Sequence, residues 1–189
     1  MVWQFWLAKI LYLGKLIDDK EVDMSDVTTA LQSFVSDAGL EKINHWIAKY
    51  PADQKQSAVM SALMVIQEEQ GYLSDEAMTN LAHYLNMAPI AVFEVANFYT
   101  MYERAPVGQH VISVCTNISC QLRGSAQIMK HLEKKLKIKV GETTSDKRFT
   151  LRSVECLGAC VNAPMMQIGK TYHEHLTASV VDEILEEHK

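Results

Sequence analysis

Four cysteines, arranged as two pairs, are the residues of this chain best suited to chemistry. Cys115 and Cys120 form a C-x4-C pair, Cys156 and Cys160 form a C-x3-C pair, and the chain has no other cysteine. We recognise no export signal, which predicts a reducing compartment. Cysteines there serve as metal ligands or redox groups more often than as structural disulfides. The two pairs therefore predict thiolate chemistry.

Three kinds of centre could use these thiolates. Structural zinc accepts four cysteines, but its usual knuckles are C-x2-C turns, which are tighter than either pair. A dithiol redox site would normally be C-x-x-C, which is absent. A two-iron cluster needs two thiolates on each iron, and two separated pairs match that need, although the spacing is not that of plant-type ferredoxins. The spacing favours an iron–sulfur cluster and leaves zinc and disulfide chemistry open.

The chain lacks the motifs that would let it do two-electron chemistry alone. Its eight glycines form neither G-x-G-x-x-G nor a Walker loop. We therefore expect no NADH, flavin or ATP site and no catalytic residue on this chain. If the chain handles electrons, we expect it to exchange them with another subunit that does the two-electron chemistry. A net charge of −5 without a basic stripe disfavours a nucleic-acid partner.

The histidines are weaker candidates than the cysteines. None of the seven stands beside a cysteine as in a Rieske centre. Three are expected inside helices, namely His45, His83 and His131. Three others are expected to face solvent, namely His173, His175 and His188.

Apolar spacing predicts helices from Asp26 to about Tyr102, joined by short connections as in an antiparallel bundle. Ser25 is a candidate cap for the first of them. The expected segments are one around residues 30–35, one ending before Pro51, one over 54–70, one capped by Ser74, and one starting at Pro89. Conspicuous Met and aromatic residues at helical spacing are predicted to be core: Met60, Met64, Met78, Phe93, Phe98 and Tyr99.

A hinge at residues 106–108 precedes signals for a small sheet. We expect strands at 110–114, 149–154, 165–168 and 171–173, and helices at 122–136 and 176–187, with Thr177 or Ser179 capping the last. This order predicts a thioredoxin-like sandwich. The predicted fold class is thus α+β, with a helical bundle over 24–107 and a thioredoxin-like domain over 108–189. Each cysteine pair follows a strand, so both pairs should meet at one rim of the sheet.

Residues 1–23 are predicted to be an extension, either a mis-called start or a loosely ordered tail. Lys9 and Lys15 interrupt their apolar run, which is short for a membrane span of about 20 residues. We expect no direct membrane insertion.

The motifs resemble one protein family. Val114-Cys115-Thr116, Cys120-x-x-Arg123-Gly124-Ser125 and the run ECLGACVNAP at 155–164 closely resemble the E subunit of bacterial NADH:quinone oxidoreductase, respiratory complex I, and its mitochondrial flavoprotein equivalent. The run VANFYTM at 95–101 agrees. The resemblance covers about residues 40–189.

This resemblance implies a [2Fe–2S] cluster in the thioredoxin-like domain, with Cys115, Cys120, Cys156 and Cys160 as its ligands. It implies an adjacent flavoprotein subunit that carries FMN and binds NADH, and other peripheral-arm subunits. The complex would be a proton-translocating oxidoreductase on the cytoplasmic face of the inner membrane. Rival interpretations are a diaphorase-type subunit of an NAD-linked hydrogenase or formate dehydrogenase, a zinc-stapled interaction module, and a dithiol enzyme.

Three finer expectations concern the surroundings of the cysteines. Backbone N–H groups of residues 157–159, and Arg123, are candidate donors to the cluster. Ser119 stands where many relatives have proline. The Ala163–Pro164 bond precedes the third strand, where thioredoxin-like folds place a cis-proline.

Overall fold

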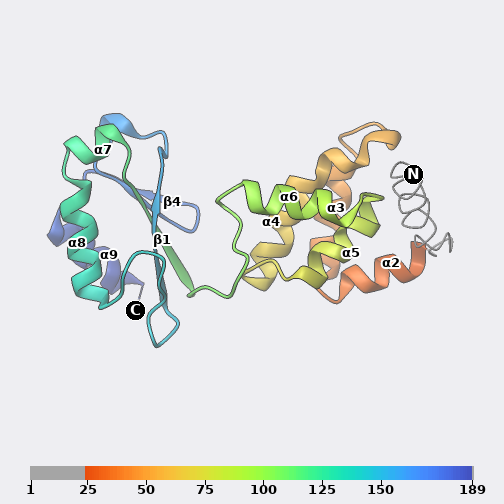
Figure 1. The fold of residues 1–189 in the computed structure, drawn as a ribbon, viewed down its shortest axis with the longest axis horizontal. Helices are drawn as coiled ribbons and strands as arrows, with labels where there is room; N and C mark the ends of the chain where they lie inside the picture. Colours follow the sequence, from red (N-terminus) through yellow and green to blue (C-terminus); the bar gives the residue numbers. More distant parts are fainter. Residues whose placement is uncertain (1–23, 189) are drawn as a thin grey trace, which may run out of the picture.

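The computed structural model describes residues 24–188, which form a helical lobe (residues 24–102) and a sheet lobe (residues 110–188), as Figure 1 shows. The predicted extension at 1–23 lies outside the described residues. The helices of the helical lobe are α2 (Met24–Gln32), α3 (Asp37–Ile47), the 3-10 helix η1 (Ala52–Ala58), α4 (Val59–Gln70), α5 (Asp75–Leu85) and α6 (Pro89–Phe98).

Serine caps and one glycine set the ends of these helices. The hydroxyls of Ser36 and Ser74 accept the backbone N–H groups of Gly39 and Ala77, both at 3.1 Å, at the starts of α3 and α5. Gly71 ends α4 with φ +81°, a left-handed conformation that glycine adopts at little cost. The Ser74 cap was predicted and is confirmed. Ser25 was predicted to precede the first helix but lies within α2.

The predicted helix over residues 54–70 is broken into two. Gln54 has φ −120° and ψ 23°, outside the helical region, so the first turns after Pro51 form the 3-10 helix η1 and the α-helix starts only at Val59. Pro89 lies in the first turn of α6, as predicted.

The core prediction for this lobe holds except at the end of α6. Met78 is buried, and Met60, Met64 and Phe93 pack against the core. Phe98 and Tyr99, however, are 77% and 39% exposed, so their assignment to the core is wrong. The buried face of α6 carries Val92 and Ala96; a residue two positions later points about 200° away around the helix.

The sheet lobe has a four-stranded sheet in the order β2-β1-β3-β4. The strands are β1 (His110–Cys115), β2 (Phe149–Val154), β3 (Met166–Ile168) and β4 (Thr171–His173). β1 runs parallel to β2 and antiparallel to β3, and β3 pairs with β4 across the predicted turn at Gly169. All four strands were predicted to within one residue at each end.

The helices of this lobe are α7 (Ile118–Leu122), α8 (Ser125–Leu136), the 3-10 helix η2 (Cys160–Asn162) and α9 (Ala178–Glu187). The predicted helix over 122–136 is interrupted because Gly124 has φ +100°, which separates α7 from α8. The hydroxyl of Thr177 accepts from the N–H of Val180, so Thr177 is the cap of α9. Side chains of α8 and α9 form a second apolar core with β1, β2 and β3.

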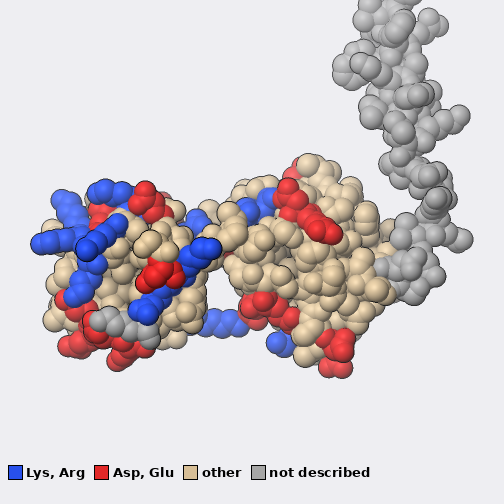
Figure 2. Space-filling view, turned by 90° about the horizontal axis from the view of Figure 1, so that it is seen from below, with Lys and Arg blue, Asp and Glu red and all other residues tan. Residues whose placement is uncertain are grey.

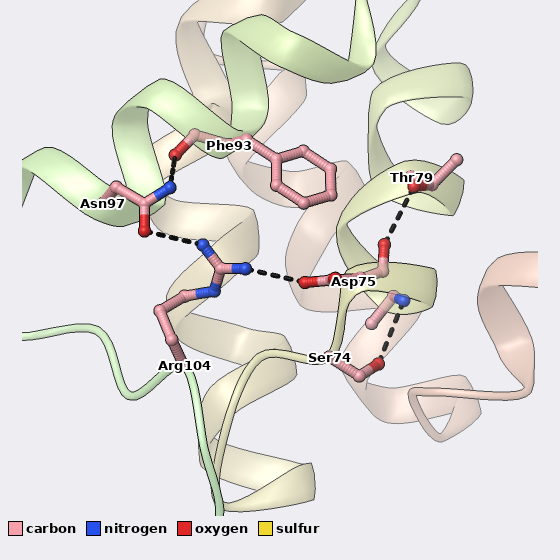
Figure 3. A network of polar contacts seen from close by, with 7 residues as sticks. Ser74, Asp75, Thr79, Phe93, Asn97 and Arg104 are labelled. Atoms are coloured by element: carbon pink, nitrogen blue, oxygen red, sulfur yellow. Dashed lines mark hydrogen bonds and ion pairs between the residues drawn. The ribbon is translucent and has the colours of Figure 1, made fainter.

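The connection between the lobes is fastened at several points. Arg104 donates to Asp75 at 2.7 Å and to Asn97 at 2.8 Å, and lies over the ring of Phe93 (Figure 3). These contacts bind the chain leaving α6 to the helical lobe. Two ion pairs then reach across to the sheet lobe, Glu103–Arg152 and Glu68–Lys170.

Charge is unevenly distributed on the face seen in Figure 2. Lysine and arginine side chains gather over the sheet lobe, whereas acidic and uncharged residues dominate the helical lobe. Lys134 and Lys135 occupy the last turn of α8, where basic groups favour the helix dipole, as predicted. Over residues 24–188, every helix is too short or too polar to cross a bilayer.

Candidate metal centre

The first cysteine pair is buried at the carboxyl end of β1. Cys115 is the last residue of β1, Cys120 lies in α7, and each is only 2% exposed. The side chain of Asn117 caps α7 by accepting the N–H of Ile118 at 2.8 Å. A strand that turns directly into a capped helix thus brings the two thiols of a C-x4-C segment together.

The second pair lies on the surface. Cys156 and Cys160 are exposed, and their sulfur atoms are 3.7 Å apart. The N–H of Gly158 donates to the Cys156 sulfur at 3.3 Å. Gly158 has φ +86°, so the turn between these cysteines uses a conformation that favours glycine. All four cysteines are free thiols.

Hydrogen bonds hold the two cysteine segments at one rim of the sheet, as the sequence predicted. The N–H of Cys115 donates to the Met165 carbonyl at 3.2 Å, and that of Thr116 to Val154 at 3.0 Å. The side chain of Asn117 donates to Glu155, next to Cys156, at 2.9 Å. The turns after β1 and β2 are therefore tied to each other.

The thiols also interact electrostatically. Burial raises the pKa of Cys120 to about 11, with further contributions from Cys115 and Cys160, while a backbone hydrogen bond from Met165 acts in the opposite direction. The hydrogen bond and charge of Cys156 raise the pKa of Cys160, with an opposing hydrogen bond from Ser119. All four sulfurs thus share one electrostatic environment. A cation that accepts thiolates would relieve their mutual repulsion.

The four cysteines form two pairs, one buried and one exposed. Across residues 24–188, no group of three or more His, Cys, Asp or Glu side chains is arranged around a single metal position. A centre with two metals needs two thiolates on each, and this donor set fits that need.

Some predicted neighbours of the cysteines are confirmed and others have different roles. The N–H of Gly158 does donate to a cysteine sulfur. Arg123 instead donates its Nε to the Ala163 carbonyl at 3.2 Å. The Ala163–Pro164 bond is cis, as predicted.

Sequence reasoning missed three residues that support the cysteine segments. These are Asn117 and Glu155, which link the two turns, and Tyr172, whose hydroxyl donates to the Leu157 carbonyl at 2.8 Å. Asn117 could have been found, because asparagine just before a short helix is a typical cap. The contacts of Glu155 and Tyr172 join segments far apart in sequence, so no local pattern indicates them.

Three of the histidines lie within helices, and three others form a cluster away from the cysteine rim. His45, His83 and His131 are within α3, α5 and α8, as predicted. His173 and His188 are half-buried, so their assignment to solvent is wrong. Both cluster with His110. The ring centroid of His188 is 4.9 Å from that of His110 and 6.1 Å from that of His173. His110 begins β1 and Cys115 ends it, about 16 Å further along the strand.

Comparison with known proteins agrees with this site. A family model described as thioredoxin-like [2Fe-2S] ferredoxin matches residues 43–189. An E subunit of the NADH-quinone oxidoreductase of Rhizobium meliloti, the one numbered 2, is 44% identical over 146 residues, 77% of this chain and 86% of that protein. The mitochondrial NADH dehydrogenase [ubiquinone] flavoprotein 2 of Dictyostelium discoideum is 45% identical over 151 residues, 79% of this chain and 61% of that protein.

A solved structure shares the fold. The crystal structure of an NAD+-reducing [NiFe]-hydrogenase in its H2-reduced state matches with a TM-score of 0.61 and 22% identity, over 69% of this chain and 22% of that chain. The family model covers most of the chain, and the Rhizobium protein is matched along most of its own length. The chain therefore belongs to the thioredoxin-like [2Fe–2S] ferredoxin family and, within it, to the E subunits of NADH-quinone oxidoreductase.

Proposed function

We propose that Cys115, Cys120, Cys156 and Cys160 hold the [2Fe–2S] cluster that characterises this family. The observation that carries the proposal is the meeting of two free thiol pairs at one rim, with the Cys156 and Cys160 sulfurs 3.7 Å apart. When bound, such a cluster takes up and releases one electron at a time. It neither binds nor oxidises NADH itself.

The chain's own residues give the two sides of this centre different surroundings. Cys115 and Cys120 pack with Ala163 and Met165 and exclude water from one side. Cys156 and Cys160 open the other side to the surface. Burial around Cys115 and Cys120 disfavours the negative charge that reduction would add. The N–H of Gly158 favours that charge on the side of Cys156 and Cys160. A redox partner would approach from the exposed side.

In this function the chain is an electron-transfer subunit of NADH-quinone oxidoreductase. It exchanges single electrons with the FMN of an adjacent NADH-binding flavoprotein subunit and contacts other subunits of the peripheral arm. The complex would lie on the cytoplasmic face of the inner membrane. Relatives named as E subunits, at 44–46% identity over three quarters of the chain, support this assignment.

The rival assignment is a diaphorase-type subunit of an NAD-linked hydrogenase or formate dehydrogenase. The likeness to the hydrogenase is at 22% identity, which supports a common fold and no more. The higher identity to the E subunits favours NADH-quinone oxidoreductase.

We also propose that the chain divides into a helical-bundle domain over 24–107 and a cluster domain over 108–189. Its support is that no apolar cluster of the described residues spans both parts: one lies within residues 27–102, and the other two lie within residues 112–185.

Metal and sulfide analysis of the anaerobically purified chain tests the cluster. We expect about two irons and two acid-labile sulfides per chain. Each Cys→Ser substitution at the four positions should lower both, whereas Ser57→Ala, at an exposed position in η1 of the helical lobe, should leave both unchanged. Zinc without sulfide would support the zinc-stapled module instead and would reject the cluster.

A further inference from the structure

The exposed cysteine pair is placed for a second chemistry besides metal binding. The sulfur atoms of Cys156 and Cys160 are 3.7 Å apart, and both side chains are exposed. Two sulfurs that bind one metal at about 2.3 Å lie at nearly this distance from each other. A disulfide has an S–S bond of about 2.05 Å, so the two sulfurs need to approach by only about 1.7 Å. A small movement therefore converts a pair spaced for a metal into a disulfide.

The turn that carries this pair leaves room for that movement. Gly158, at its centre, is exposed, and a Cβ built on it would meet no atom within 4 Å. Hydrogen bonds reach the two sulfurs from the N–H of Gly158 and from the side chain of Ser119. Both donors are at the surface, so water can replace the sulfurs as their partner. Rotation of either cysteine side chain then brings the sulfurs together without refolding the turn.

The other pair is shielded from reagents in solution. Cys115 and Cys120 are each 2% exposed and pack with Ala163 and Met165. Their side chains are hydrogen-bonded to each other, so each cysteine of the chain has a thiol neighbour within its own pair. Exchange with a dissolved disulfide requires its sulfur to reach the attacking thiolate. Only the exposed pair meets that requirement in the folded chain.

We propose that Cys156 and Cys160 form a reversible disulfide in the chain that lacks its cluster, with a low-molecular-weight disulfide such as oxidised glutathione as the oxidant. This bond must be reduced before the exposed half of the site accepts iron. The inference rests on the proposed function, because it concerns the same site before the cluster is bound. An exposed disulfide is readily reduced again by dithiols, so the oxidised chain is a waiting state and not a damaged one.

The reaction is a two-step thiol–disulfide exchange. One thiol of the pair loses its proton to water, and its thiolate attacks a sulfur of oxidised glutathione. A mixed disulfide forms and one glutathione thiolate leaves. The thiolate of the second cysteine then attacks the protein sulfur of the mixed disulfide, the Cys156–Cys160 bond forms, and the second glutathione thiolate leaves. Two electrons pass from the cysteine sulfurs to glutathione, and no other oxidant is needed.

Thiol mapping of the full chain after cluster removal tests this disulfide. Iron is removed anaerobically with a chelator, the reduced chain is incubated with oxidised glutathione, and the remaining thiols are alkylated after unfolding. Mass spectrometry should find Cys156 and Cys160 linked to each other. The buried pair is the internal control, and Cys115 and Cys120 should both carry the alkyl label. The chain with its cluster in place should form no disulfide and keep its iron over the same time.

Cys160→Ser separates the two steps. Without the second thiol the reaction should stop at the mixed disulfide, with one glutathione on Cys156 that dithiothreitol removes. Binding of ferrous iron alone gives an independent readout. The oxidised chain should bind it at least about tenfold more weakly than the reduced chain, because two of its thiolates are no longer available as ligands. Dithiothreitol should restore the affinity.

The outcomes that overturn the proposal are distinct. Random pairing of the four cysteines, or a bond between Cys115 and Cys120 alone, would show that burial does not select the pair. Glutathione that stays on Cys156 of the unchanged chain would show that the ring does not close. Equal affinity of the oxidised and reduced chains for ferrous iron would remove the link to loading.

Failure of the proposed function has a different signature. A chain that never holds iron and sulfide, but forms the Cys156–Cys160 bond, would contradict the cluster and leave the disulfide standing. A chain that takes up its cluster normally, but whose exposed thiols stay free in oxidised glutathione, would contradict only the inference drawn from the exposed pair.

Discussion

Gly158 determines the shape of the turn between the two exposed cysteines. Its φ of +86° is costly for residues with a Cβ, although an added Cβ would meet no atom within 4 Å. The strain of a side chain here is therefore one of backbone conformation and not of crowding. Its N–H also points at the Cys156 sulfur, 3.3 Å away. One residue thus sets both the turn and a hydrogen bond to a proposed ligand.

Gly158→Ala should cost about 1 kcal/mol through the left-handed conformation and should loosen the hydrogen bond to Cys156. We expect the variant to lose iron faster than the unchanged chain when challenged with a chelator. Absorbance of the cluster over time measures this.

Gly71→Ala provides the control, since Gly71 has φ +81° and an equally open Cβ position at the end of α4. It should show the same loss of stability without faster iron loss. Equal rates of iron loss in both variants would argue against a specific role for Gly158.

At the scale of elements, the carboxyl end of α9 is held against the sheet by a cluster of histidines. Burial lowers the pKa of His110 and of His173, and the charge of His188 lowers both further. Arg148 adds to the effect on His110, whereas Glu187 opposes it on His173. Neutral rings are therefore favoured in the folded chain.

This cluster predicts that acid weakens the folded state. Because the unfolded histidines have the higher pKa, they bind protons first as the pH falls. The stability that the neutral rings contribute is present above about pH 6.5 and is lost as the pH falls below it. His188→Gln removes the charge that both other rings feel. It should reduce the difference in the free energy of unfolding between pH 7.5 and pH 5.5, as measured by urea denaturation.

His83→Gln serves for comparison, because His83 is exposed in α5. Its difference between the two pH values should equal that of the unchanged chain. If His188→Gln behaves in the same way as His83→Gln, the histidine cluster does not contribute to the acid sensitivity.

At the scale of the whole molecule, an ion pair between the buried Glu103 carboxylate and the partly exposed Arg152 links the two lobes. Glu103 is only 7% exposed, and its N–H and carbonyl also bond within the helical lobe, to Gln67 and Leu73. Burial raises the pKa of Glu103, and the charge of Arg152 partly offsets this. Arg152 lies on β2, the strand that leads into the second cysteine pair. The Glu103–Arg152 ion pair therefore connects the helical lobe to the strand that ends at the candidate metal centre.

Arg152→Met should leave the Glu103 carboxylate buried without its counter-charge. We expect a loss of about 2 kcal/mol in the free energy of unfolding at pH 8, where the carboxyl must be charged. The loss should be smaller at pH 5, because the raised pKa of Glu103 favours its neutral, protonated carboxyl there. The stability that comes with the protonated carboxyl is lost as the pH rises. Urea denaturation at the two pH values measures both.

Lys170→Met breaks the other ion pair between the lobes. Its side chain is 84% exposed, so the change should stay within about 0.5 kcal/mol. A loss of stability as large as that of Arg152→Met would mean that burial does not distinguish the two pairs.

Features that depend only on residues next to each other in the sequence were determined by the sequence alone. Helix starts such as Ser74 and Pro89, the hairpin turn at Gly169, the strands, and the spacing of the cysteine pairs all follow from local conformational preferences. These preferences act within a few residues, so they can be read without the fold. The resemblance of the ECLGACVNAP motif added the cluster type and the family.

Only the tertiary structure decided which side chains are covered. It buried Cys115 and Cys120 but exposed Cys156 and Cys160, and it placed Phe98 in solvent. It also brought together His110 and His188, and Glu103 and Arg152, which are far apart along the chain. Burial and pairing of this kind depend on which elements pack against each other, and a helix or strand pattern states only that one face is apolar. The two pairs of thiols were thus visible in the sequence, whereas the open side from which a partner can reach them was not.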